Sequence, residues 1–536
     1  MLAWIPEKLM LNGNSLQWQQ SLVLHINPRI PMEAATFISL GLYFIAMLGI
    51  GLYSFKQSNT DIEGYMLGGR NLSPKVTALS AGASDMSGWM LMGLPGAMYV
   101  SGMSSAWIAI GLVIGAYLNY LLVAPRLRVY TELANNAITI PDYFENRFND
   151  TSHILRIVSS VVIVVFFTLY TSSGVVAGGK LFETSFGLDY ELGLYITAGV
   201  VVAYTLFGGF LAVSITDFVQ GCIMFIALIL VPVVVLFDLG GISGAASELN
   251  SLPGNYLDMF VDTATGQPLT LIAIISMLSW GAGYFGQPHI IVRFMAIRSV
   301  NDIKTAQYIG MSWMVVAISG ALATGLLGLA YVTGHDNQLS DPETIFIYLS
   351  QLLFHPLIGG FLLAAILAAV MSTISSQLLV TSSSLTGDFY QAFFRRDASQ
   401  KELVIVGRLS VVLVALVAIY LAYDRDSSIL TLVSNAWAGF GAAFGPLVLI
   451  SLCWKRMTRN AAIAGMLVGA ITVLFWIYAP VTINGMLLSE WIYELVPGFL
   501  ASSLTIIIIS LLSKQDDQIV LTTFDEVQVA LSKRTR

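Results

Sequence analysis

Charged residues are scarce in this chain. Asp, Glu, Lys and Arg together make up 11% of its 536 residues, whereas a soluble domain usually carries about 25%. Hydrophobic residues make up 56% of the sequence. These proportions exclude a soluble globular protein. They indicate an all-α integral membrane protein, because a helix satisfies its own backbone hydrogen bonds inside a bilayer.

Cysteine is almost absent as well. Cys222 and Cys453 both lie in apolar segments without a metal-binding or redox spacing, so a disulfide framework is not expected. The five histidines are scattered, which argues against a metal centre. The sequence has no Walker motif and no soluble segment long enough for an ATPase domain. We therefore expect a protein that is not an enzyme, has no cofactor and is not driven by ATP.

The first 31 residues lack the basic start, apolar run and small-residue cleavage site of a signal peptide. They are mixed in composition and partly amphipathic, and Met32 directly precedes the first long apolar run. Residues 1–31 are interpreted either as a short surface extension or as a segment before a true start at Met32. We favour the second interpretation.

Long apolar runs are abundant. A helix of about 20 apolar residues crosses the hydrocarbon core of a bilayer. Thirteen segments are predicted to do so: residues 35–54, 76–98, 105–125, 155–180, 188–208, 212–238, 270–292, 307–333, 358–388, 402–422, 428–452, 460–478 and 490–512.

Lys and Arg are unevenly distributed between the predicted loops. They collect in alternate connections, as with Arg293, Arg298 and Lys304 after span seven. The connections 239–269 and 334–357 contain no basic residue but carry acidic ones. Because basic residues mark cytoplasmic loops, the predicted topology has the N-terminus outside and the C-terminus in the cytoplasm.

Two spans contain residues that interrupt helices. Span two reads ALSAGASDMSGWMLMGLPG at 78–96, with Asp85 inside an apolar segment. Span seven is interrupted by Gly281, Gly283, Gly286 and Pro288. Small residues can also serve close helix packing. However, an intramembrane carboxylate indicates a functional site, and interrupted spans at matching positions of two inverted halves indicate a transporter's binding site. Spans two and seven are five apart, so they run in opposite directions.

Polar and aromatic side chains of four spans are predicted to lie at similar depth. They are Asp85, Met86, Tyr170, Trp280, Tyr284, Ser372 and Thr373. Trp and Tyr usually lie at the membrane interfaces, so their central position indicates a binding role. Most other hydroxyl residues of span nine are interpreted as interhelical hydrogen-bonding groups.

Five segments of the chain read ALSAGASDMSGWMLMGLPGA, GGFLAVSITDFVQ, WGAGYFGQPHIIVRFMA, ILAAVMSTISSQLLV and AWAGFGAAFGP. Together they resemble the sodium/solute symporter family, in particular its branch of bacterial sodium/proline symporters. The resemblance extends from about Met32 to the end of span thirteen. It implies a leucine-transporter-type fold of 13 transmembrane helices with a five-plus-five inverted repeat and broken spans two and seven.

The resemblance also implies how the chain is divided. The first inverted repeat covers residues 76–238 (spans two to six), and the second covers residues 270–452 (spans seven to eleven). The other parts are the N-terminal extension, the first span with its cytoplasmic loop, an external loop, spans twelve and thirteen, and a cytoplasmic tail. Their ranges are 1–31, 32–75, 239–269, 453–512 and 513–536, in that order.

A sodium site between spans two and nine is implied by the same resemblance. Its ligands would be the backbone carbonyls of Ala83, Met86 and Ala369 and the hydroxyls of Ser372 and Thr373. Neutral oxygens hold a hard monovalent cation without trapping it. Asp85, Ser87, Gly88 and Asp217 would serve sodium coupling, with direct ligation by Asp85 left open. Asp217 would be a waypoint for sodium release; the alternative is a solvated carboxylate at a helix start.

The implied function is sodium-coupled uptake of L-proline by alternating access across the bacterial cytoplasmic (inner) membrane. The implied substrate-binding residues are Trp89, Tyr170, Trp280, Tyr284 and Pro288. Aromatic faces enclose the pyrrolidine ring and attract its ammonium group, and a half-helix N-terminus at either break would receive the carboxylate. The alternatives are a sodium symporter for another small solute of the family and a channel. The expected partners are L-proline, Na⁺ and membrane lipids, with neither nucleic acid nor an obligate protein partner.

Overall fold

The structure, a computed structural model, describes residues 34–57, 62–252, 254–263, 265–425, 427–483 and 485–534. The predicted N-terminal extension, residues 1–31, and the proposed start at Met32 lie outside these ranges. The described chain is almost entirely helical, with two short antiparallel hairpins.

The first half of the chain contains α1 (Ala34–Gln57), α2 (Ile62–Leu67), η2 (Gly68–Arg70), α3 (Pro74–Asp85), η3 (Trp89–Gly93), α4 (Leu94–Ser101), η4 (Gly102–Ser105), α5 (Ala106–Leu118), η5 (Asn119–Val123), α6 (Ala124–Leu133), α7 (Ile140–Arg147), α8 (Ile154–Phe186), α9 (Tyr190–Asp238) and α10 (Gly241–Ser251). Elements labelled η are 3-10 or π-helical turns. The hairpin β1 (Val261–Asp262) and β2 (Gln267–Pro268) pairs Val261 with Pro268.

The second half contains α11 (Leu271–Leu278), η6 (Ser279–Gly286), α12 (Pro288–Ala296), η7 (Val300–Asp302), α13 (Ile303–Gly334), η8 (Pro342–Thr344), α14 (Ile345–Leu352), α15 (Pro356–Ser383), η9 (Ser384–Phe394), α16 (Gln400–Leu421), α17 (Ile429–Cys453), α18 (Arg459–Tyr478), α19 (Leu488–Trp491), α20 (Leu495–Leu512) and α21 (Gln518–Arg534). The hairpin β3 (Thr482–Ile483) and β4 (Met486–Leu487) precedes α19.

Ten helical segments in the described ranges are long and apolar enough to cross a membrane. They are Ala34–Tyr53, Trp89–Leu133, Ile154–Phe186, Gly209–Asp238, Val300–Gly334, Pro356–Phe394, Gln400–Leu421, Ile429–Cys453, Arg459–Tyr478 and Leu495–Leu512. Two shorter apolar helical segments are Tyr190–Leu206 and Leu271–Gly286. The chain is therefore a helical membrane protein with about ten apolar spans.

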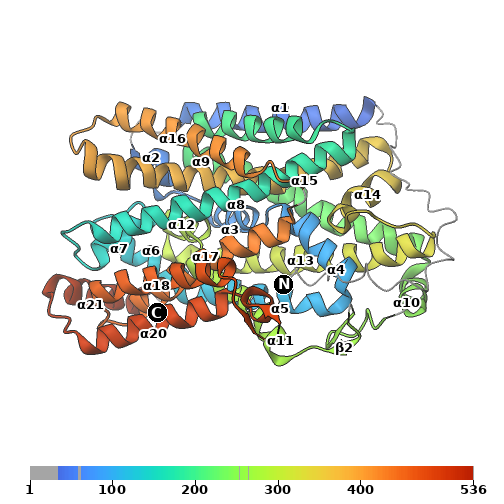
Figure 1. Ribbon diagram of the computed structural model, residues 1–536. Coiled ribbons are helices and arrows are strands. Elements are labelled where there is room, and N and C mark those ends of the chain that lie inside the picture. Colours follow the sequence, from blue (N-terminus) through green and yellow to red (C-terminus); the bar gives the residue numbers. More distant parts are fainter. Residues whose placement is uncertain are drawn as a thin grey trace.

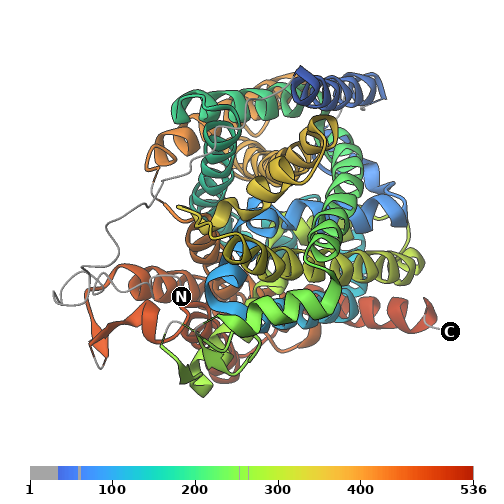
Figure 2. The same cartoon turned by 90° about the vertical axis from the view of Figure 1, so that its right-hand side faces the viewer.

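The long helices lie side by side in one bundle (Figure 1). α2, α7 and α21 lie towards one end of this bundle, and α10, α14 and β2 towards the other. Figure 2 looks onto the end where α10 and α14 lie. α3 and α15 contact each other and α9, and α1 packs against α9 and α15 at the edge.

A left-handed glycine divides the 49-residue helix α9. Gly209 has φ 57° and ψ −161°, and a Cβ there would meet Tyr65 at 2.8 Å. Only glycine takes this conformation readily, so the helix axis breaks between Tyr190–Leu206 and Gly209–Asp238. Gly102, with φ 60°, similarly separates α4 from the helical turns that lead into α5.

Ionic contacts hold the bundle end near α14. Lys180, at the end of α8, lies 3.1 Å from carboxylate oxygens of both Asp341 and Glu343. The Glu343 carboxylate also accepts hydrogen bonds from the Ile429 and Leu430 amides, each at 3.2 Å. These amides belong to the first turn of α17, where backbone N–H groups have no helical acceptor. Glu343 therefore caps α17 and joins it to α8.

The last helix, α21, packs against α6 at the opposite end. Phe524 is buried, with its ring 6.5 Å from the ring of Tyr130 and 5.3 Å from the guanidinium carbon of Arg147. Arg147 in turn donates to the Ser451 carbonyl of α17 at 2.9 Å. The tail is thus part of the packed molecule.

Candidate functional site

The chain leaves the helical path directly after Asp85. Met86, with φ −84° and ψ 76°, ends α3, and helical structure resumes at Trp89 as a π-helical turn. The Ser87 amide donates to the Asp85 carbonyl at 3.0 Å. In a continued helix this amide would bond the Ala83 carbonyl four residues earlier. The break therefore leaves the Ala83 carbonyl available to other donors.

Two hydroxyls of α15 meet the Ala83 carbonyl. The Ser372 hydroxyl donates to it at 2.7 Å and the Thr373 hydroxyl lies 3.5 Å away. Both hydroxyls also reach the Ala369 carbonyl, at 3.0 Å and 3.2 Å. Four of the five predicted sodium ligands are thus brought together in the bundle core. Met86, which carries the fifth predicted ligand, is also buried.

The Asp85 carboxylate faces the second interrupted span. Its Oδ2 accepts a hydrogen bond from the Tyr284 hydroxyl of η6. The backbone carbonyl of Asp85 accepts the Trp89 indole N–H at 3.0 Å and the Tyr170 hydroxyl at 3.5 Å. Asp85 is 2% exposed. One residue of α3 therefore contacts three of the predicted substrate-binding side chains.

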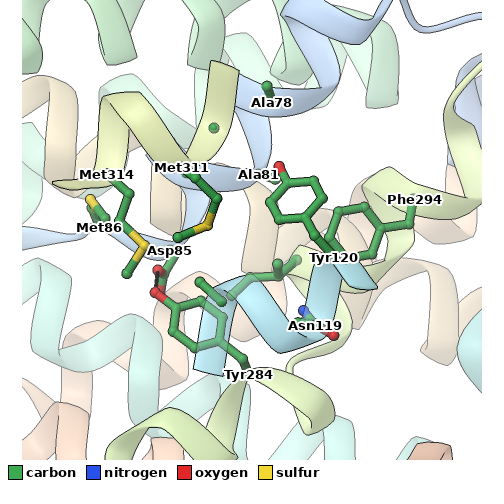
Figure 3. Close-up of a pocket in the computed structure, with 14 residues that line it drawn as sticks. Ala78, Ala81, Asp85, Met86, Asn119, Tyr120, Tyr284, Phe294, Met311 and Met314 are labelled. Carbon is green, nitrogen blue, oxygen red and sulfur yellow. Dashed lines mark hydrogen bonds between the residues drawn. The ribbon is translucent and has the colours of Figure 1, made fainter. Parts of the chain in front are cut away.

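Figure 3 shows a small cavity beside this contact. Asp85 and Tyr284 point towards each other at one side of it, and Asn119 and Tyr120 approach from η5. Its volume is about 30 Å³, enough for about one or two water molecules. Met86 and Tyr284 line this cavity, whereas Trp89, Tyr170, Trp280 and Pro288 are not part of its lining.

Span seven changes conformation over the interrupted stretch. η6 is a 3-10 helix, Gln287 is extended with φ −88° and ψ 103°, and α12 begins at Pro288. Pro288 suits the first position of a helix because its missing N–H has no acceptor there. The Trp280 ring stacks on Tyr493 with centroids 5.4 Å apart. Trp280 therefore lies on the side of η6 that faces the segment before α20.

Several buried polar atoms around the two breaks have no hydrogen-bond partner among the described residues. They are Oδ1 of Asp85, Oδ1 of Asn119, Nε1 of Trp280, Oε1 of Gln287, and both ring nitrogens of His289. An unsatisfied buried polar group costs about 1–3 kcal/mol. Each such group needs a structural or functional explanation, and these lie on α3, η5, η6 and α12 and at Gln287 between η6 and α12.

Asp217 lies in α9 and is fully buried. Its Oδ2 is 3.1 Å from Nη2 of Arg293 and accepts the hydroxyls of Ser80 at 2.8 Å and Ser376 at 3.4 Å. The solvated carboxylate that we considered as an alternative is therefore wrong. Arg293, expected in a cytoplasmic loop, is instead fully buried inside α12.

The C-terminal end of α12 is anchored to the segment after α2. The Leu72 amide donates to the Ala296 carbonyl at 3.1 Å. The Arg70 guanidinium donates to the carbonyls of Met295 at 2.8 Å and Ala137 at 2.6 Å. Burial, reinforced by the charge of Arg128, lowers the pKa of Arg70 to about 10. Arg70 therefore keeps its charge at neutral pH.

The matching family model is that of the sodium:solute symporter family, over residues 65–469. The chain belongs to this family. The osmoregulated proline transporter OpuE of Bacillus subtilis (strain 168) is 58% identical to this symporter, over 90% of this chain and 96% of its own length. The high-affinity proline transporter PutP of the same organism is 57% identical, over 91% and 100%. Sodium/proline symporter 2 of Staphylococcus saprophyticus is 54% identical, over 92% and 96%.

Two solved structures share the fold of this symporter. A Na⁺-coupled sialic acid symporter in a substrate-bound outward-open state aligns with a TM-score of 0.73 at 20% identity, covering 91% of this chain and 99% of its own. Mhp1, a nucleobase-cation-symport-1 family transporter, aligns with a TM-score of 0.52 at 14% identity, covering 86% and 98%. The fold is therefore that of a helical membrane transporter.

Some residues of this site were missed in the sequence. Ser80 and Ser376 resemble ordinary hydroxyl residues of apolar helices, and Arg293 resembles a loop residue beside a span. Gln287 and His289 flank Pro288 and drew no interpretation of their own. The available signal was the cluster of polar residues at 287–293 within the interrupted span. Its polarity alone does not reveal which groups are buried or paired.

Proposed function

We propose that this symporter takes up L-proline together with Na⁺ across the cytoplasmic membrane of a bacterium by alternating access. The family membership supports coupling to Na⁺, and relatives at 54–58% identity are named proline transporters or sodium/proline symporters. In this proposal membrane lipids surround the helical bundle. Neither nucleic acid nor an obligate protein partner is part of the proposal.

The observation that carries the sodium site is the meeting of the Ser372 and Thr373 hydroxyls with the Ala83 carbonyl. We assign the ion to this place, with the carbonyls of Ala369 and Met86 completing its ligands. Carbonyl and hydroxyl oxygens are uncharged, and they can still bind an alkali cation. Asp85 would add negative charge near the ion, and Ser87 and Gly88 follow it at the break. Asp217 would attract the ion on its way to the cytoplasm.

The substrate would lie between the two interrupted spans, against Trp89, Tyr170, Trp280, Tyr284 and Pro288. The hydrogen bonds of Tyr284, Tyr170 and Trp89 to Asp85 support this placement because they join the aromatic groups to the ion-coupling residue. Aromatic faces provide apolar contact for the pyrrolidine ring and attraction for its ammonium. The cavity beside Asp85 and Tyr284 has a volume of about 30 Å³, so binding of proline there would require the surrounding helices to separate.

The thirteen-span topology remains part of the proposal. Dividing Trp89–Leu133 at Gly102 and counting the shorter segments Tyr190–Leu206 and Leu271–Gly286 gives thirteen crossings. α3 then extends span two, and α12 extends span seven. The N-terminus would lie outside and the C-terminus in the cytoplasm. Residues 76–238 and 270–452 would form the inverted repeats. The ends of α3 at Asp85 and of η6 at Gly286 support breaks in spans two and seven.

Uptake of labelled L-proline into liposomes containing the purified protein tests this function. We expect an inward Na⁺ gradient to drive accumulation, and an interior-negative potential to increase it, because Na⁺ enters with a zwitterion of zero net charge. A potential of about 100 mV contributes about 2.3 kcal/mol per charge, and a tenfold gradient about 1.4 kcal/mol. One Na⁺ per proline would sustain accumulation on the order of a thousandfold.

Liposomes with K⁺ in place of Na⁺ on both sides are the matched control. Accumulation that persists after both gradients are collapsed contradicts the mechanism. Equilibration without accumulation indicates a channel instead. Another small solute could instead accumulate with Na⁺, without inhibition by excess L-proline. This result would support sodium coupling and contradict L-proline as the substrate.

A further inference from the structure

His289, the second residue of α12, is a fully buried polar side chain without a polar partner. Its exposed fraction is 0%, and neither Nδ1 nor Nε2 has a hydrogen-bond partner within the part of the chain that the structure describes. A neutral imidazole has one N–H donor and one acceptor nitrogen. Leaving such groups unpaired is unfavourable by about 1–3 kcal/mol each. A ligand that pairs with the ring would remove this cost.

The surroundings of His289 suit an amphipathic small molecule. Its ring lies edge-on to the rings of Phe167, at 5.2 Å, and Tyr170, at 5.9 Å. The Phe167 ring lies 4.3 Å from that of Phe440. Sites for small molecules combine apolar and aromatic walls with a few polar groups that fix the orientation of the ligand. His289 brings a polar ring into this aromatic part of the core.

The site of His289 is close to the break in span two. Tyr170 contacts His289 with its ring and reaches the Asp85 carbonyl with its hydroxyl, at 3.5 Å. The Tyr284 hydroxyl contacts the Asp85 carboxylate from η6. One side chain, Tyr170, therefore connects the first turn of α12 with Asp85.

Opposite charges are favoured at the two sides of this region. The helix dipole favours negative charge at the N-terminus of a helix, although the Ile290 and Ile291 amides of α12 already donate to the Gln287 carbonyl. His289 occupies that turn of the nine-residue helix α12. Asp85 lies across the region, and its Oδ1 is unpaired in the described part of the chain. A zwitterion would place its carboxylate towards His289 and its ammonium towards Asp85.

We propose that His289 binds the carboxylate of the transported amino acid through its ring N–H, at the N-terminus of α12. The inference rests on the proposed function, in which the substrate is L-proline. It selects the break of span seven as the place where the carboxylate is recognised. In this proposal His289 also makes the protein bind amino acids more tightly than analogues that lack the carboxylate.

The test compares L-proline with L-prolinamide, which keeps the ring and the ammonium group but lacks the carboxylate. Equilibrium binding of labelled L-proline to the purified protein in saturating Na⁺, and its competition by prolinamide, give both affinities. We expect His289→Phe to weaken L-proline binding about 10- to 100-fold, as expected for loss of a hydrogen bond to a charged group. Prolinamide affinity should change by less than about threefold, since phenylalanine preserves the aromatic packing.

His289→Gln and His289→Met form a second pair of similar size. Glutamine keeps an N–H donor and methionine has none. We therefore expect the His289→Gln variant to prefer proline over prolinamide more strongly than the His289→Met variant does. This pair decides the question if His289→Phe does not fold. His335→Phe is the matched control, because His335 stacks on Tyr331 at the far end of α13. It should bind both compounds as the wild type does.

The wild-type measurement separates the two hypotheses. Failure of the wild type to bind L-proline would overturn the proposed function and with it this role of His289. If the wild type binds L-proline and the His289 variants keep its preference over prolinamide, only the role of His289 is overturned. An equal loss of affinity for both compounds would show a packing role and would overturn it as well.

Discussion

The guanidinium of Arg293 lies 3.1 Å from Oδ2 of Asp217, and no more than 1% of either side chain is exposed. The pair joins α12, the half of span seven after its break, to α9. Ser80 of α3 and Ser376 of α15 also bond this pair, because the Ser80 hydroxyl accepts from Arg293 at 3.1 Å and both hydroxyls donate to Asp217. One buried network therefore connects four helices around the candidate site.

Removing one charge of this pair should destabilise the protein strongly. A buried ion left without its partner costs about 3–5 kcal/mol, whereas replacing both partners by neutral groups is often nearly neutral. We expect Asp217→Asn and Arg293→Met each to lower the thermal unfolding midpoint, and the double variant to recover much of the loss. Unfolding of the purified protein in detergent, followed by tryptophan fluorescence, measures this. Additive losses in the double variant would contradict the coupling.

The hydroxyls of α15 should determine the apparent affinity for Na⁺. Ser372→Ala and Thr373→Ala each remove one oxygen from the proposed ligands, and we expect each to raise the Na⁺ concentration for half-maximal proline uptake at least about tenfold, which corresponds to about 1.4 kcal/mol. Ser375→Ala is the matched control, because the Ser375 hydroxyl bonds the Ser372 carbonyl within the same helix. Wild-type Na⁺ dependence in both variants would reject this ion site.

The hydrogen bond between Tyr284 and Asp85 should couple substrate binding to the ion. Asp85→Asn keeps the shape of the side chain but removes its charge, and we expect it nearly to abolish coupled uptake. Tyr284→Phe keeps the ring and removes only the hydroxyl that bonds Asp85. We expect it to reduce the effect of Na⁺ on proline affinity and, by reciprocity, the effect of proline on Na⁺ affinity.

Equilibrium binding of each ligand with and without the other measures this coupling. Tyr120→Phe removes another hydroxyl that lines the same cavity and serves as its control. Unchanged coupling in Tyr284→Phe would show that the hydrogen bond does not transmit the effect of the ion.

Backbone contact between α5 and η6 should make two glycines intolerant of substitution. A Cβ on Gly115 would lie 2.0 Å from the Gly281 carbonyl oxygen, and a Cβ on Gly281 would lie 2.1 Å from that of Gly111. We expect Gly281→Ala to lower stability by about 1–3 kcal/mol through overpacking. Gly49→Ala in α1, where no atom lies within 4 Å of the added Cβ, should not. Thermal unfolding of both variants tests this, and equal stability would contradict the close contact.

The features that the sequence predicted well are those that local chemistry determines. Apolar length predicted a helical membrane protein, and ten segments of its described residues are long and apolar enough to span a membrane. Gly, Pro and Asp85 within apolar runs drew attention to the places where α3 ends and η6 begins. The pairing of Ala83 with Ser372 joins residues 289 positions apart. Periodicity and charge carry no information about such a contact, and only the family resemblance indicated it.

Other features depend on three-dimensional packing and were not accessible. Arg293 lies at the end of an apolar run, as snorkelling or loop arginines do. It is nevertheless buried, and it pairs with a carboxylate from a different helix. Whether the ring nitrogens of His289 have hydrogen-bond partners likewise depends on the positions of side chains from other helices. Accounting for buried donors and acceptors requires the positions of all neighbouring helices.

Helix α21 gives the C-terminal tail a mechanical connection to the transport core. Phe524 packs beside Arg147, and Arg147 holds the end of α17 through the Ser451 carbonyl. Any rearrangement that moves α7 away from α17 must therefore either carry the tail along or release it. A fluorescent label on exposed Asp525 would follow opening and closing of that end of the bundle in real time, and deletion of the tail would alter how fast it opens.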